Sequence, residues 1–477
     1  MTTPRTVAAE QRLVDALTAP IEVDDVLRVD GPLLFVRVTE PVGWDDHVDV
    51  RVPGGDIRHG VVIDVERDLA IVEVYEGTEG IGTAQTTVSF SGTPTVLPAT
   101  DRWLGRVCDG RGAPRDGGPA IVGAVTRPVA GSVINPAKRT VPTDPVLTGV
   151  SAIDGLMTLV RGQKLPVFSE AGLPHLELAI QIAAQARVEG AQFSVVFAGM
   201  GLTNADVDLI VGGLEDRVHK RQACLFLNTA DDPVIERILT PRVALTVAEH
   251  LAYELGHHVL VVLSDMTSYC DAVRQLSAAR GEVPSRRGYP GYLFSDLASI
   301  YERCGRITGR PGSITEVPIL TMPAGDITHP VPDLTGYITE GQIVLSPDVL
   351  GRGVTPPIDA LSSLSRLMRR GVGEGRTRED HRAIAAQVLA LLSLALQAEE
   401  LASLIGVEAL SITEQRYLSF ADRFESDVIA QGGSESRSLE DTLDRLWKTA
   451  SIMPTRELTM VSEEQIARYR SPDGRSR

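Results

Sequence analysis

The sequence predicts an α/β protein with three parts: a small N-terminal β-barrel, a central doubly wound parallel sheet, and a C-terminal helical domain. Three observations predict this organisation. The first part of the chain contains short β-type segments, the middle alternates apolar strand-like and helical segments, and the last part shows only helical patterns. The 477 residues also exceed the ~250–300 at which a single hydrophobic core stops growing.

The N-terminal barrel is predicted over residues 1–80. From Val26 to about Gly80, short β-type segments alternate with breaks at Gly and Asp. Several short strands at this spacing suggest a closed barrel, and an open sheet packed on its neighbour is the alternative. The helix-like stretch Val7–Leu17 is expected to form a short leading arm.

The central domain is predicted over residues 81–358. It begins with a long connection, residues 81–150, which is rich in Gly, Pro and Thr. Continuous apolar runs are typical of parallel strands that are covered on both faces. The strand candidates are LPVFS (165–169), QFSVVFA (192–198), ACLFLN (223–228), HVLVVLS (258–264), VPILTM (317–322) and QIVLS (342–346). The helices expected between them cover Leu178–Val188, Ala205–Lys220, Val243–Tyr253 and Cys270–Ala279. Ligands bind such sheets at the C-terminal ends of the strands.

The C-terminal helical domain is predicted over residues 359–470. Three helix starts of capping-box type begin at Thr377, Ser411 and Ser438, each followed three residues later by an acidic residue. Residues 471–477 are expected to be a disordered tail.

Composition narrows the classes of partner. The formal net charge of -17 argues against nucleic acid, which proteins bind with Lys and Arg. The four cysteines are too scattered for a metal knuckle or a redox pair, and we expect no metal site in this chain. The N-terminus has no apolar run of the signal-peptide type, and the most apolar stretch, Ala383–Ala398, is too short to span a bilayer. These features predict a cytoplasmic protein that reaches a membrane only through partners.

The segment after the strand candidate 165–169 stands where a phosphate-binding loop would open a helix. Such a loop, GxxxxGK[ST], needs backbone N–H donors, a Lys for the β- and γ-phosphates and a hydroxyl for Mg²⁺. Here Ser169 and Pro174 replace the consensus glycines, with Gly172 between them. His175 replaces the Lys and Leu176 replaces the hydroxyl residue. An ordinary strand–turn–helix without any relation to nucleotides is the alternative.

Two further positions bear on nucleotide chemistry. Asp265 follows the apolar run HVLVVLS, the arrangement in which a carboxylate ligates Mg²⁺ (Walker B), although apolar strands that end in Asp are common. Leu202 lies where a carboxylate or Gln would orient the attacking water, and it cannot polarise water. Gly172, Pro174, His175 and Asp265 are therefore predicted to form a vestigial nucleotide position.

Several long segments resemble the B subunit of V-type and archaeal or bacterial A-type rotary ATPases. They include PVFSEAGLPHLELAIQIAAQA, GEVPSRRGYPGYLFSDLASIYERCGR, PDLTGYITEGQIVLS and LSSLSRLMRRGVGEGRTREDH, and the resemblance runs from about Val26 to Leu458. It implies a β-barrel, a RecA-type central domain and a C-terminal helical domain. In that family the GLPH loop replaces the Walker A sequence, and B subunits alternate with catalytic A subunits in an A3B3 ring around a central rotor stalk, with peripheral stalks outside.

The resemblance also implies a residue role. Arg366, in SLSRLM, is similar to the arginine-finger segment of the family, through which a B subunit completes the active site of its A neighbour. A structural Arg paired with a nearby carboxylate is the alternative, and Arg369 and Arg370 are the fallback candidates. ATP or ADP with Mg²⁺ is expected at the interface with the A subunit, and none is expected to bind this chain tightly by itself. The family usually has Asn where this chain has Leu176, so nucleotide binding at the other, non-catalytic interface stays open.

Two other classes of protein remain as alternatives. A self-sufficient ATPase of the protein-export or helicase kind would need a Lys at position 175 and a carboxylate near position 202, and neither is present. A pure scaffold would take no part in catalysis. The direction of the reaction, synthesis or pumping, and the choice of proton or sodium are left undetermined.

Other polar residues are expected to have structural roles. We expect His257 and His258 to be exposed at a sheet edge and Arg286 and Arg287 to order a loop. Packing is the expected role of Tyr289, Tyr292 and Tyr301.

Overall fold

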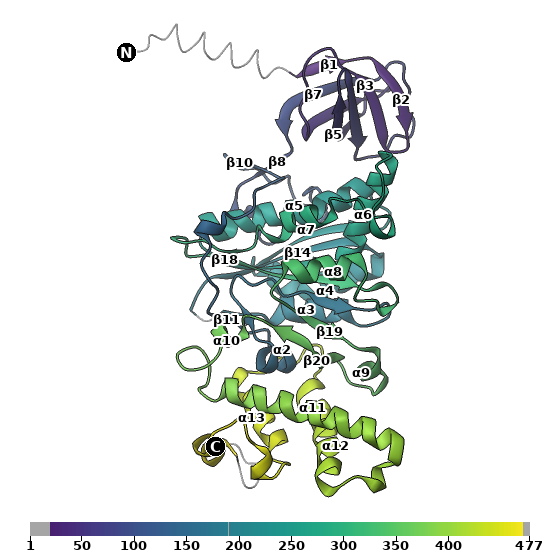
Figure 1. Cartoon of the computed structure of the whole chain (residues 1–477). Coiled ribbons are helices and arrows are strands. Elements are labelled where there is room, and N and C mark those ends of the chain that lie inside the picture. The colour runs from purple at the N-terminus through teal and green to yellow at the C-terminus, as the bar shows by residue number, and fades with distance from the viewer. Residues whose placement is uncertain (1–19, 189, 471–477) are drawn as a thin grey trace, which may run out of the picture.

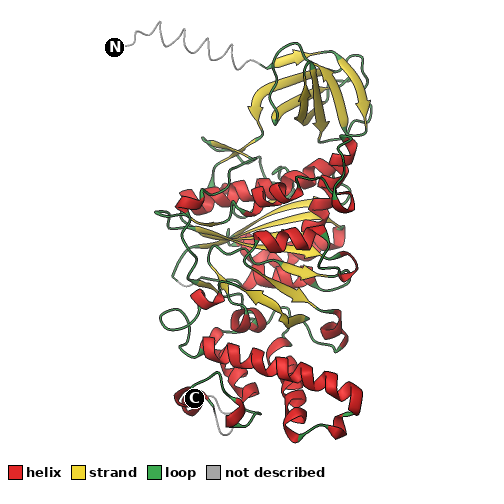
Figure 2. Ribbon diagram, in the orientation of Figure 1, coloured by secondary structure: helices red, strands yellow, loops and turns green. Residues whose placement is uncertain are grey.

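The computed structural model describes residues 20–188 and 190–470. The chain forms an elongated molecule with the barrel at one end, the α/β domain in the middle and the helical domain at the other end (Figure 1; Figure 2). The predicted three-part fold is confirmed. The expected leading arm, Val7–Leu17, and the expected tail, residues 471–477, lie outside the described residues.

The N-terminal domain is an antiparallel β-barrel whose interior is filled mainly by valines. In sheet order its strands are β1 (Ile21–Val23), β7 (Thr87–Pro94), β4 (Asp46–Arg51), β5 (Ile57–Glu66), β6 (Leu69–Val74), β3 (Leu33–Arg37) and β2 (Val26–Asp30). The predicted end of this domain at residue 80 is too early. Strand β7 pairs with β1 and β4, and its alternating Val88 and Phe90 are fully buried in the barrel core. The Gly- and Thr-rich flanks of β7 hid this two-residue period.

The central domain is built on a mostly parallel sheet. Its strands in order are β20 (Ile358–Ser365), β19 (Gly341–Leu345), β13 (Val167–Ser169), β18 (Ser313–Thr321), β16 (His258–Ser264), β14 (Phe193–Leu202), β15 (Ala223–Thr229) and β9 (Val107–Asp109). All six predicted strands are present. Strand β20 runs antiparallel to β19 along one edge, so the sheet continues past the predicted boundary at residue 358. The short β17 (Gly305–Arg306) pairs with β18 off this path.

Helices cover both faces of this sheet, and alternate residues of one strand face the two layers. On β14, Val195 and Phe197 enter the core shared with the helical domain, whereas Val196 and Ala198 enter the core on the opposite face. The helices of the central domain are α2 (Ser151–Leu156), α3 (His175–Gln185), α4 (Asn204–His219), α5 (Val234–Glu249), α6 (Met266–Ala279), α7 (Leu293–Tyr301), α8 (Pro330–Ile338), α9 (Pro347–Gly351) and α10 (Met368–Gly371).

The connection between the barrel and α2 carries more structure than its composition predicts. Strand β9 forms the outer edge of the central sheet, parallel to β15. Two small, separate antiparallel pairs also form in this connection and just after α2. These are β8 (Val96–Pro98) with β10 (Thr126–Pro128), and β11 (Pro145–Val146) with β12 (Leu159–Val160). Trp103 is buried against Phe226 of β15, which anchors this segment to the sheet.

The C-terminal domain consists of helices α11 (His381–Ile405), α12 (Ile412–Phe424), α13 (Leu439–Ala450) and α14 (Glu463–Tyr469). By length and composition α11 is able to cross a membrane, but it buries Ile384, Val388 and Leu391 in the protein core.

Two of the three predicted helix starts are confirmed. Ser411 forms a complete capping box with Glu414, and the side chain of Ser438 accepts the N–H of Asp441. The start at Thr377 is wrong: α11 begins at His381, and the Thr377 hydroxyl instead accepts the N–H of Gly373. The hydroxyl of Thr377 is used to close a loop, which a local capping pattern does not distinguish from a helix start.

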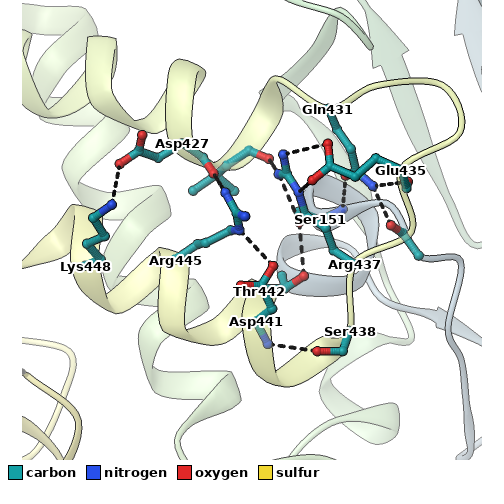
Figure 3. Close-up of polar contacts among 12 residues, drawn as sticks. Ser151, Asp427, Gln431, Glu435, Arg437, Ser438, Asp441, Thr442, Arg445 and Lys448 are labelled. Carbon is teal, nitrogen blue, oxygen red and sulfur yellow. Dashed lines mark hydrogen bonds and ion pairs between the residues drawn. The ribbon is translucent and has the colours of Figure 1, made fainter. Parts of the chain in front are cut away.

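A buried polar cluster joins the helical domain to α2 (Figure 3). Arg437 is 6% exposed and donates to the carbonyls of Val428 (2.9 Å) and Ala430 (2.6 Å). The amide of Gln431 bridges to the central domain, because it donates to the carbonyl of Gly149 (2.6 Å) and accepts the N–H of Ser151 (3.0 Å). These contacts hold the two domains in one arrangement.

Candidate functional site

The loop predicted to be a vestigial phosphate loop lies at the C-terminal end of β13. This strand is in the interior of the sheet, paired with β18 and β19, and α3 begins six residues after it ends. Gly172 adopts a left-handed conformation (φ +86°) at the exposed tip of the loop. The topology is therefore that of a phosphate loop, a tight turn between a buried strand and a helix N-terminus.

Residues 174 and 175 of this loop offer no free backbone N–H to a phosphate. Pro174 is the N-cap of α3 and has no N–H to offer. The N–H of His175 donates to the carbonyl of Leu173 (2.8 Å), and its Nδ1 lies 3.2 Å from the Ser169 hydroxyl. Leu176 is buried in the core shared with the helical domain. These residues do not fit a magnesium nucleotide held by this chain alone.

Asp265 ends β16 and caps the N-terminus of α6. One of its carboxylate oxygens accepts the N–H of Thr267 (2.6 Å), and the other accepts the Thr321 hydroxyl (2.5 Å). Burial raises the pKa of Asp265, against the effect of the Thr321 hydrogen bond. Both oxygens thus have protein donors, and the carboxyl acts as a helix cap rather than as a free ligand.

Leu202 occupies the position at which an ATPase would carry a residue that orients the attacking water. It ends β14, is 6% exposed and belongs to the core shared with the helical domain. A Cβ added at Gly199 would lie 2.4 Å from the Leu202 side chain, so glycine at 199 makes room for this leucine. The side chain at this position is therefore hydrocarbon, which cannot activate water.

Arg366 immediately follows β20 and is exposed. Its guanidinium donates one hydrogen bond, to the carbonyl of Thr339 (3.2 Å), and its N–H donates to Glu340 (3.0 Å). In the described part of the chain Arg366, Arg369 and Arg370 form no ion pair. The alternative of a structural arginine paired with a carboxylate therefore does not describe Arg366.

The structure separates Arg366 from the loop predicted to be a vestigial phosphate loop. Ser365 pairs with Gly341, the first residue of β19, and β19 runs parallel to β13. Arg366 therefore lies at the edge of the sheet where the parallel strands begin. Ser169 and Asp265 lie at the opposite edge, where the strands end. Arg366 cannot reach the nucleotide position of its own chain.

The expected exposure of His257 and His258 is wrong. They are 5% and 7% exposed, because β16 lies inside the sheet between β14 and β18. Each ring contacts a serine hydroxyl at 2.9 Å, Ser194 for His257 and Ser313 for His258. Burial lowers the pKa of His258 to about 4, so this imidazole is neutral.

The other polar residues are structural, as predicted, with one exception. Arg286 donates to the carbonyl of Thr328 and Arg287 to Asp326, so the pair orders a loop. Tyr289 and Tyr301 are buried, whereas Tyr292 is 40% exposed. All four cysteines are free and buried.

The sequence reading missed one cluster of potential ligands. His47, Asp49 and His59 lie on neighbouring strands of the barrel and place their donor atoms within 4.8 Å of one another. His47 and Asp49 are two residues apart, so in a strand their side chains lie on the same face. Nothing in the local sequence shows that His59 pairs opposite Asp49.

Comparisons with known proteins agree with this architecture. The ATP synthase alpha/beta family matches in its beta-barrel domain at residues 26–92 and in its nucleotide-binding domain at residues 149–365, and the C-terminal domain of V and A type ATP synthase matches at residues 370–470. The structure of a unique ATP synthase subunit, NeqB from Nanoarcheaum equitans, is similar to this chain with a TM-score of 0.71 and 35% identity. The match covers 89% of this chain and 100% of that one. The chain therefore belongs to the ATP synthase alpha/beta family, in its V and A type branch, and the resemblance to B subunits is confirmed.

Proposed function

We propose that this chain is a non-catalytic subunit of a V/A-type rotary ATPase and that it completes the catalytic site of a neighbouring A subunit through Arg366. The observation that carries the proposal is the position of Arg366, exposed and without an ion pair among the described residues, at the sheet edge opposite its own phosphate-loop position. An arginine in that place is able to serve only a nucleotide held by another chain.

The chemistry suits an arginine. The guanidinium is planar, permanently charged and able to form two parallel hydrogen bonds to phosphate oxygens. A guanidinium supplied in trans to a phosphoryl group accounts for rate factors of ~10³–10⁵ in other nucleotide hydrolases. The single bond from Arg366 to Thr339 orients the side chain and leaves further N–H groups for a ligand.

The nucleotide is held mainly by the partner in this proposal. ATP or ADP with Mg²⁺ would bind at the interface with the A subunit, because this chain offers Pro174, an engaged His175 amide and a buried Leu176 in place of a phosphate cradle. By itself the chain would be inert.

Family membership supports the wider assembly. The chain would alternate with A subunits in an A3B3 ring, contact the rotor and peripheral stalks, and reach the membrane only through the complex, on its cytoplasmic side. Synthesis or hydrolysis of ATP would be coupled to proton or sodium transport through other subunits.

The test is an A–B ring reconstituted with Arg366→Ala. We expect assembly to persist and steady-state ATP turnover to fall by ~10³ or more. Arg369→Ala and Arg370→Ala serve as matched variants, since both residues are exposed neighbours without ion pairs in the described chain. Near wild-type turnover in the Arg366→Ala ring would overturn the assignment. If turnover were lost only with Arg369→Ala or Arg370→Ala, the arginine-finger role would belong to that residue instead.

The rival functions give different results. A self-sufficient ATPase would hydrolyse ATP as a purified chain with Mg²⁺, and a pure scaffold would leave the nucleotide affinity of the A–B pair equal to that of A alone. We expect neither outcome.

A further inference from the structure

The outer surface of the barrel carries a convergent set of side chains that the ATPase function does not use. Asp49 on β4 pairs in register with His59 on β5. His47 lies two residues before Asp49 on the same strand, so the pleat places both side chains on one face. The three side chains therefore meet above two neighbouring strands.

Their nitrogen and oxygen atoms point to one place. Oδ1 of Asp49 lies 2.8 Å from Nδ1 of His59 and 3.2 Å from Nε2 of His47. The two imidazole rings stack, with their centroids 5.6 Å apart. One carboxylate oxygen thus contacts both imidazoles, and all three groups are accessible, with side-chain exposures of 32% for His47, 49% for Asp49 and 47% for His59.

These distances are close to those of a tetrahedral metal site. With zinc–nitrogen and zinc–oxygen bonds of ~2.0–2.2 Å, the ligand atoms of a tetrahedron lie about 3.3 Å apart. The two distances from Asp49 already approach this value, and the two histidine ligand atoms lie within 4.8 Å. Small rotations of exposed side chains would bring all three onto one ion.

We propose that His47, Asp49 and His59 bind one zinc ion on the barrel, with the fourth position open to water. Two imidazoles with one carboxylate suit Zn²⁺, whereas Mg²⁺ and Ca²⁺ prefer ligand sets made of oxygen. Because the ligands come from two strands, the ion ties β4 to β5 and stabilises the barrel.

The charged residues next to the cluster are engaged with other groups. The backbone N–H of His59 donates to Glu76, whose carboxylate also pairs with Arg111. The nearby Arg58 is turned away, since its guanidinium donates to the carbonyls of Gly77 (2.8 Å) and Glu79 (2.7 Å).

The experiment uses the full-length chain with any affinity tag removed and metal stripped by a chelator. Zn²⁺ is titrated by calorimetry, Co²⁺ is titrated as a spectroscopic probe, and thermal unfolding is followed with and without Zn²⁺. We expect one Zn²⁺ per chain, a Co²⁺ spectrum of tetrahedral type and a higher unfolding temperature with metal.

Substituted variants distinguish Zn²⁺ binding at this site from nonspecific Zn²⁺ binding to an acidic protein surface. We expect His47→Ala and His59→Ala each to weaken Zn²⁺ binding by more than ~100-fold, because even outer-shell changes at metal sites cost 10–100-fold. His219→Ala is the matched control, since His219 is a more exposed histidine that faces a single carboxylate, Glu215, at 4.0 Å.

Two results would overturn the proposal. One is a wild-type chain that binds no Zn²⁺, and the other is a doubly substituted chain, His47→Ala with His59→Ala, that binds it as tightly as wild type. Metal-free unfolding temperatures of all variants provide the folding control, because the substituted side chains lie on the outer barrel surface.

Discussion

The guanidinium of Arg366 donates a single hydrogen bond, 3.2 Å long, to the carbonyl oxygen of Thr339. This bond joins the residue after β20 to the residue that precedes β19 by two positions. It orients the arginine at the edge of the sheet and engages only one of its N–H groups. Stability and catalysis should therefore depend on Arg366 to very different extents.

Arg366→Ala should separate these two properties. An exposed residue with one hydrogen bond contributes little to folding, so the free energy of unfolding of the isolated chain should change by less than about 1 kcal/mol. Urea unfolding of the isolated chain measures this change. Arg366→Lys should not restore turnover in the reconstituted ring, because an ammonium group cannot form the bidentate contact of a guanidinium. Full activity with Lys would indicate that charge alone is sufficient.

A grafted phosphate loop should bind nucleotide without hydrolysing it. The triple variant Pro174→Gly, His175→Lys and Leu176→Thr restores a backbone donor, a fixed cation and a hydroxyl. Each charge-assisted hydrogen bond is worth ~1.5–3 kcal/mol, so we expect the isolated chain to gain at least about tenfold in affinity for ATP. Turnover should stay absent, because Leu202 still fills the water-orienting position. Fluorescent-nucleotide titration and phosphate release measure the two effects, with Pro174→Gly alone as the control.

The buried carboxyl of Glu316 should make stability depend on pH. Burial raises its pKa to about 8, against the opposing effects of Cys304 and Lys164. The folded chain therefore holds this proton more tightly than the unfolded chain, whose value is near 4.5. It follows that the free energy of unfolding falls as the pH rises from about 4.5 to about 8, at up to ~1.4 kcal/mol per pH unit.

Glu316→Gln should remove this contribution, since its amide does not titrate. Denaturant unfolding measured across that pH range should show the variant gaining stability relative to wild type as the pH rises. The exposed Glu464→Gln serves as the control and should follow wild type. Parallel pH curves for wild type and Glu316→Gln would contradict the prediction.

The buried arginine that joins the helical domain to α2 should be important for stability. Arg437→Ala leaves the carbonyls of Val428 and Ala430 without their donor and should lower the free energy of unfolding by roughly 2–4 kcal/mol (Figure 3). Arg445→Ala removes a partly exposed pair with Asp441 and one hydrogen bond to the carbonyl of Asp427 (3.0 Å), and it should cost less, about 1 kcal/mol. Urea unfolding gives both values. Faster hydrogen exchange in α13 should accompany only the first substitution.

Local patterns were sufficient for the elements whose signal lies in one continuous segment. The apolar run 258–264 is strand β16, with the predicted first and last residues, because a strand buried on both faces needs hydrophobic side chains throughout. Ser411 and Glu414 form the predicted capping box, since both partners lie within four residues. The absence of a lysine at position 175 and of a carboxylate at position 202 was also visible directly.

Pairing between distant segments was not visible in the sequence. Strand β7 looked like part of a connection, and β9 could not be recognised at all, because each is defined by the strand that lies beside it. His257 and His258 seemed to be at an edge, and only the order of the sheet shows that β16 is interior.

The sequence by itself thus determined the three-part fold, the family and the absence of a lysine at position 175, because periodicity and residue chemistry are properties of single segments. Only the tertiary structure decided that Arg366 lies at the sheet edge opposite Ser169 and Asp265, and that His59 faces Asp49. The physical reason is that strand direction and register arise from hydrogen bonds between segments far apart in the chain, and a shift of one residue would turn every side chain to the other face.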